Sequence, residues 1–257
     1  MLPVVDHERF DNPPLRAMLG QVQFPPILRL QKGVPAVADF QDEIRDVFPA
    51  FGVETQIQIR VAPSGEAETS TNRAAAYRFT NEAETWSVLL APSALSLEAV
   101  AGGRYSSFAE FADLFRVVLA AAVQHLQPGK ISRQGLRYVD HIEGDRTPEE
   151  WRGWINNEVL GGIAGAVLGS GLEQAVCELI YPQADGQIVF RHGIVRAGQQ
   201  NEKGYLLDFD SSHTDGMDPA NIEAVMSRFD ESHDVLYRFF RWCITEAAGR
   251  EFRTAHA

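Results

Sequence analysis

The sequence contains few of the residues that usually reveal a protein's chemistry. Its 257 residues include only two cysteines, Cys177 and Cys243, and no CxxC pair, which excludes the usual signals of a zinc site or a redox motif. Basic residues number 23 against 35 acidic ones, so the formal net charge is −12. Nucleic-acid binders normally carry a basic surface for phosphate contacts, and the acidic balance therefore argues against that class.

Long apolar runs are also missing. The longest mildly apolar run, residues 160–172, is too short and too rich in glycine to span a membrane. Residues 1–15 lack the basic region and following apolar region of a secretory signal peptide. The sequence therefore predicts a cytoplasmic protein with no membrane segment and with two reduced thiols.

Complete catalytic motifs are absent as well. The sequence has no GxSxG, HExxH or GK[ST], and the glycine-rich run 160–172 does not lie between a strand and a helix as a nucleotide fingerprint requires. The acidic stretch 208–219 fails as an EF-hand loop, because its sixth position is His213 instead of glycine and its twelfth is Pro219 instead of glutamate. We predict no metal, no cofactor and no catalytic residue.

The sequence does contain clear strand and helix patterns. The most regular helix pattern begins at Ser106 or Ser107 and stops at Pro128-Gly129, and a second long helix is predicted from Asp218 to residue 252. A shorter helix over 147–159 would be capped by Thr147. The first strand, within 20–31, contains Pro25 and Pro26, which cannot donate to a ladder, so we expect it to lie at a sheet edge or to begin late. Other strands are predicted at 53–61, 74–81, 85–100, 131–142, 171–182, 186–197 and 203–213.

The order of these elements suggests a duplication. Residues 20–127 give strand, helix, three strands and long helix, and residues 131–252 give the same order without a residue-level repeat. We therefore predict an α+β fold made of two similar halves, residues 1–129 and 130–257, in which an antiparallel sheet is covered by long helices. Short turns between successive strands exclude a doubly wound parallel sheet.

One predicted strand raises a functional question. In the stretch ISRQGLRYVDHIEGD, alternation places Arg133, Arg137 and His141 on one face. Such a row could bind a phosphate or a carboxylate. Alternatively, acids within the fold could pair with it, and Asp208 and Asp210 share one face of a later strand. We favour structural ion pairing and retain the anion site as the alternative.

A hydrolytic site is a third interpretation. Asp208, Asp210 and His213 stand close together in the sequence LLDFDSSH, and these residue types serve in nucleases and hydrolases. The acids are explained as well by a turn that precedes a capped helix. We therefore do not assign catalysis to them.

Four motifs in order resemble those of a bacterial family. They are NPPL (12–15), RQGLRYVDHI (133–142), LLDFD (206–210) and HDVLYRFFRWCITE (233–246). Together they are similar to a sporadically distributed family of uncharacterised bacterial proteins of about this length. The resemblance covers almost the whole chain but implies no activity. The patchy distribution of that family is similar to that of toxin–antitoxin and phage-defence modules.

These observations favour a binding function over an enzymatic one. We expect a non-catalytic binding or regulatory protein that acts through a protein partner in a defence-type or toxin–antitoxin-type module. The alternative is a sensor of an anionic small molecule, such as a nucleotide, that uses the row of Arg133, Arg137 and His141. A homodimer is compatible with either interpretation.

Overall fold

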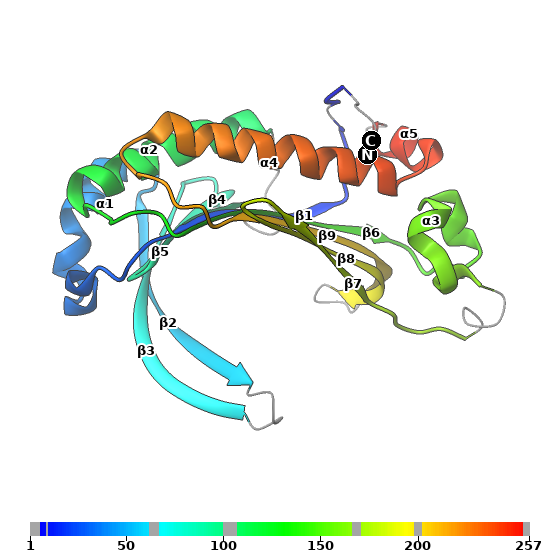
Figure 1. Cartoon of the computed structure of the whole chain (residues 1–257), viewed down its shortest axis with the longest axis horizontal. Helices are drawn as coiled ribbons and strands as arrows, with labels where there is room; N and C mark the ends of the chain where they lie inside the picture. The colour runs from blue at the N-terminus through cyan, green and yellow to red at the C-terminus, as the bar shows by residue number, and fades with distance from the viewer. Residues whose placement is uncertain are drawn as a thin grey trace. The chain divides into compact units, whose positions relative to one another are not determined.

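The chain forms an α+β fold built on a nine-stranded antiparallel sheet (Figure 1). This computed structural model describes residues 6–8, 10–61, 67–99, 107–165, 171–197 and 202–253. The strands are β1 (Leu15–Gln23), β2 (Ala50–Val61), β3 (Ala67–Thr80), β4 (Trp86–Ala91), β5 (Ala94–Ala99), β6 (Arg133–Glu143), β7 (Cys177–Gln183), β8 (Gly186–Ala197) and β9 (Glu202–His213). The helices are α1 (Ala38–Ile44), α2 (Phe108–His125), α3 (Asn157–Leu160), α4 (Ile222–Cys243) and α5 (Glu246–Arg253), and short 3-10 turns are η1 (Leu28–Lys32), η2 (Val34–Val37), η3 (Glu150–Gly153) and η4 (Gly161–Ala164).

The strand order places β1 in the middle of the sheet. Hydrogen bonding gives the order β2-β3-β4-β5-β1-β6-β9-β8-β7, so the expectation that the first strand lies at an edge or begins late is wrong: it is central, and it begins at Leu15, before the predicted residue 20. The physical reason is that β1 ends at Gln23, before Pro25 and Pro26, so neither proline needs to donate to a ladder. The terminal strands are β2 and β7.

Two compact units divide the chain. The first contains Met1–Met18, Gly135–His213 and Ser227–Ala257, and the second contains Leu19–Gln134 and Thr214–Met226. In the second unit, the ring of Phe111 on α2 lies 6.2 Å from that of Trp86 on β4, and both side chains are fully buried. Gly20 of β1 allows this close packing, because a Cβ atom there would lie 2.2 Å from the Phe111 ring.

In the first unit, α4 packs on the face formed by β6, β9 and β8 (Figure 1). Phe239 of α4 contacts Phe190 of β8 and Phe209 of β9 at centroid distances of 6.2 Å each, and all three are buried. The Tyr138 hydroxyl on β6 lies 2.9 Å from Nδ1 of His233 on α4. The opposite face of these strands carries a different, charged set of side chains.

The helix boundaries follow side-chain capping. Ser107 caps α2 by accepting a hydrogen bond from the Glu110 N–H, as one of the two predicted caps requires, whereas Ser106 lies outside the described residues. The last helix begins at Ile222 instead of Asp218, because Asn221 accepts from the Ala224 N–H and supplies the cap. It is also interrupted after Cys243, where Thr245 caps α5 by accepting from the Ala248 N–H.

Two other expectations need correction. Residues 85–100 were expected to form one broken strand, but they fold as the hairpin of β4 and β5, in which Ala91 pairs with Ala94. The predicted helix over 147–159 is divided into η3 and α3. Thr147 and Glu150 do form a capping box there, but Asn156 starts the next helix with its own side-chain cap.

Candidate functional site

Arg137 of β6 forms an ion pair with an acid that is almost fully buried. Its Nε and Nη2 atoms each lie 2.8 Å from an oxygen of Asp208 on β9, so the two side chains form a bidentate ion pair. Only 3% of the Asp208 side chain is exposed, against 44% for Arg137. The hydrogen bond that Arg137 donates to Asp208 is the main reason that the pKa of Arg137 is raised, and Asp210 adds to the effect through its charge.

The ion pair is part of a ladder that crosses four strands. Arg191 of β8 lies 3.4 Å from the second Asp208 oxygen and 2.6 Å from Glu178 on β7. Charges therefore alternate from β6 to β7 as Arg137, Asp208, Arg191 and Glu178, which we name the Asp208 ladder. Two arginines on one buried carboxylate offset its desolvation, whereas either alone would leave it less well paired.

The other members of the predicted row do not join this ladder. His141 is buried, and a Cβ atom on Gly204 would lie only 2.4 Å from its Nε2 atom, so the ring packs on the β9 backbone. Its backbone N–H donates to the Pro14 carbonyl. Arg133 belongs to the second compact unit, whereas Arg137 and His141 belong to the first.

The second unit has a corresponding ladder that the sequence analysis missed. Arg78 of β3 forms ion pairs with Glu54 of β2 and Glu98 of β5, and its Nη1 atom lies 2.6 Å from the Ser87 hydroxyl of β4. These contacts raise the pKa of Arg78, with the Glu54 hydrogen bond contributing most. The signal in the sequence is a single arginine between two buried aromatic residues, Tyr77 and Phe79. Alternation along the strand places the arginine on the face opposite the aromatic side chains.

Asp140 of β6 is a buried acid of another kind. It is 5% exposed, and no described residue donates a hydrogen bond to its carboxyl group. Desolvation raises the pKa of Asp140 to about 8, and the negative charge of Asp208 adds to the effect. The group is therefore mostly protonated at neutral pH, and its sequence neighbour Glu143 pairs with Arg16 instead.

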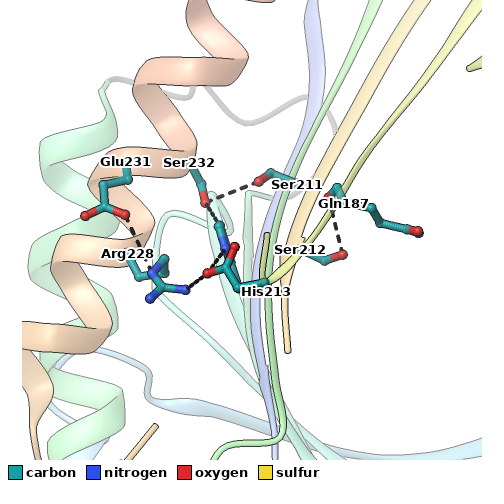
Figure 2. Close-up of polar contacts among 8 residues, drawn as sticks. Gln187, Ser211, Ser212, His213, Arg228, Glu231 and Ser232 are labelled. Carbon is teal, nitrogen blue, oxygen red and sulfur yellow. Dashed lines mark hydrogen bonds and ion pairs between the residues drawn. The ribbon is translucent and has the colours of Figure 1, made fainter. Parts of the chain in front are cut away.

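A polar cluster joins α4 to the β8–β9 hairpin (Figure 2). His213, the last residue of β9, lies 3.1 Å from Asp185 through Nδ1 and 3.1 Å from the Ser232 hydroxyl through Nε2. Ser211 lies 3.4 Å from the same hydroxyl, and Arg228 of α4 pairs with Asp185. Neither Asp185 nor Ser232 was singled out from the sequence, because 28 and 19 residues separate them from His213.

The connectivity is that of an Asp-His-Ser triad, but its setting is structural. A nucleophilic serine must be reachable by a carbonyl carbon and must stand beside oxyanion donors. Ser232 and Ser211 are each only 4% exposed, and Ser232 points from α4 into the sheet. The cluster therefore holds α4 against the end of β9 and the turn between β7 and β8.

The predicted hydrolytic trio is not one site. Asp208 points toward Arg137 and Arg191, on the face opposite α4, while His213 points toward Ser232 on α4. Alternation along β9 places Asp210 on the same face as Asp208 and opposite His213. Among the described residues, no three His, Cys, Asp or Glu side chains are placed to hold a metal ion.

Strand β7 is the least covered element of the first unit. It is a terminal strand, and all seven of its residues are exposed. Large apolar side chains at this edge are Val176 (50% exposed), Leu179 (40%), Ile180 (54%) and Tyr181 (38%). An edge strand with free backbone groups and apolar side chains is a template for pairing with another strand.

Comparison with protein families and with curated proteins identifies no relative. No protein-family model matches the chain, and no curated protein is similar enough to count as one. None of the helices in the described part of the chain is long and apolar enough to cross a membrane.

Proposed function

We propose that the protein is a non-catalytic binding or regulatory protein that acts through a protein partner. The observation that carries this proposal is the edge strand β7, whose apolar side chains are 38–54% exposed. Four large apolar residues stand within six positions, two on each face of the strand, and exposed apolar side chains along an unpaired sheet edge mark a site for strand pairing with another protein. The net charge of −12 favours a basic partner over an acidic one.

The sequence motifs suggest the setting. Their resemblance to a patchily distributed bacterial family supports a role in a defence-type or toxin–antitoxin-type module, and we extend the proposal to a cytoplasmic module of that kind. The strand order supports a duplicated origin of residues 1–129 and 130–257, although the first half has five strands and the second four, because in each half the first strand neighbours the last: β1 pairs with β5 and β6 pairs with β9.

The sensor interpretation has less support. An anionic ligand at Arg137 would compete with Asp208, whose carboxylate already accepts hydrogen bonds from Nε and Nη2 of the guanidinium group. The buried Asp208 would then lose its closest counter-ion and keep the longer contact with Arg191, at a cost of about 2–4 kcal/mol, somewhat below that of a buried charge left with no partner. The ligand's own contacts would have to exceed that free energy for net binding.

Co-expression with the product of the adjacent gene tests the proposal. We expect the two proteins to co-purify in a fixed ratio through affinity and size-exclusion steps. A substitution that places a charge at the centre of β7, Ile180→Lys, should release the partner. If the wild-type protein stays alone when co-expressed with each of its neighbours, the proposed function fails.

A further inference from the structure

The backbone of β7 shows which of its groups are free for a partner. The Ala175 N–H donates to the Ile194 carbonyl at 2.9 Å, and the register that pairs Cys177 with His192 continues that contact. In an antiparallel ladder every second residue points its N–H and C=O toward the same neighbour. Residues 175, 177, 179, 181 and 183 therefore bond to β8, and residues 176, 178, 180 and 182 point away from it.

Proline in this strand agrees with that assignment. Pro182 has no N–H, and proline is tolerated in strands where the missing donor would face away from the sheet. The outward side of β7 therefore offers three N–H donors, from Val176, Glu178 and Ile180, and four carbonyl acceptors, which include that of Pro182. These groups specify the ladder that an added strand can form.

The side chains define what that strand must carry. Leu179 and Tyr181 lie on the α4 side, since the Tyr181 ring is 5.6 Å from Phe239. Ile180 and Glu178 lie on the other side, where Glu178 bonds to Arg191. An added strand would meet apolar groups on both faces and a half-exposed carboxylate on one.

We propose that β7 binds an extended segment of a basic partner protein by strand addition, with apolar residues on both faces of the segment and a Lys or Arg opposite Glu178. This inference rests on the proposed function and names the site and chemistry of the partner. Cross-strand pairs of opposite charge and apolar pairs stabilise such ladders. The partner's excess of basic residues would also complement the net charge of −12.

A second copy of this chain fits the edge less well. In a symmetric pairing about Ile180, Glu178 of each copy faces Pro182 of the other. Because proline has no N–H, two hydrogen bonds of the ladder cannot form, one at each Pro182. Two copies that each carry a net charge of −12 also repel. A separate basic strand loses one donor instead of two and avoids the repulsion between copies.

The test uses the full-length protein and a phage-displayed library of random dodecapeptides. We expect enriched peptides that alternate apolar residues and contain Lys or Arg. Ile180→Lys should weaken binding of an enriched synthetic peptide at least tenfold. The matched control is Val53→Lys on the other terminal strand, where the side chain is equally exposed at 54%, and it should leave binding unchanged.

Amide hydrogen exchange supplies a readout specific to strand addition. On binding of the peptide, the amides of Val176, Glu178 and Ile180 should become protected, while those of Cys177 and Leu179 should already be protected in the free protein. If the peptide protected all β7 amides equally, or if no peptides were enriched, the proposal would be overturned. A dimer in light scattering that Ile180→Lys dissociates would show a second copy at the edge instead.

The two proposals fail in different ways. If a neighbouring gene product co-purifies but Ile180→Lys does not release it, the protein is a binding protein that uses another surface, and the strand-addition proposal is wrong. If peptides add to β7 and yet no partner protein co-purifies, the edge binds as described and the proposed function is wrong.

Discussion

Replacing Asp140 by asparagine should stabilise the protein, and more so at higher pH. The folded state holds a proton on Asp140 up to about pH 8, whereas the unfolded chain releases it near 3.8. Folding therefore takes up a proton between these values, and stability falls as the pH rises through them. At about 1.4 kcal/mol for each pH unit, the cost reaches about 4 kcal/mol at pH 7 and about 5 kcal/mol at pH 8. Asparagine has the shape of the protonated acid and carries no such cost.

Urea denaturation at pH 5, 6, 7 and 8 measures this difference. The Asp140→Asn variant should exceed the wild type by about 2 kcal/mol at pH 5 and by about 5 kcal/mol at pH 8. The control is Asp11→Asn, at an exposed acid in the lead-in segment, whose stability should follow the wild type at each pH. Parallel curves for wild type and Asp140→Asn would refute the assignment of a buried, protonated acid.

Three further substitutions test the other polar contacts. Arg137→Ala should destabilise the protein by about 2–4 kcal/mol in urea denaturation because Asp208 stays buried, and a neutral effect would show that the ion pair contributes little. Burial lowers the pKa of His233 to about 4, so its neutral imidazole should contribute about 3 kcal/mol less to stability at pH 4 than at pH 6.5, and His233→Gln, which cannot take up that proton, should gain stability relative to the wild type by that amount over this range. Ser232→Ala should cost about 1–2 kcal/mol in thermal or urea unfolding while any activity in a serine-hydrolase probe assay stays at background; labelling of the wild type at Ser232 would contradict the structural role.

Local patterns predicted much of the secondary structure. The strand over residues 186–197 has the predicted bounds of β8, because alternation is regular there and glycine starts the strand. Capping chemistry also identified Ser107, as one of two candidates, and Thr147 as caps. Local signals are informative at such positions because the atoms that decide them lie within four residues of each other.

Long-range order could not be predicted in the same way. The central place of β1 depends on its pairing with β5 and β6, which no local pattern encodes. The break after Cys243 depends on the Thr245 N–H reaching the Trp154 carbonyl, 91 residues away in the chain. The pairing of Arg137 with Asp208 joins strands 71 residues apart, and the sequence could only offer Asp208 as one of several candidate acids.

Pro182 has a consequence for solubility. An apolar terminal strand with a complete row of donors could accept copy after copy of the same chain and grow into an open-ended aggregate. The proline interrupts that row near the end of β7, so the ladder that forms there is short and finite. Pro182 therefore favours recognition of a single added strand over edge-to-edge aggregation of many copies.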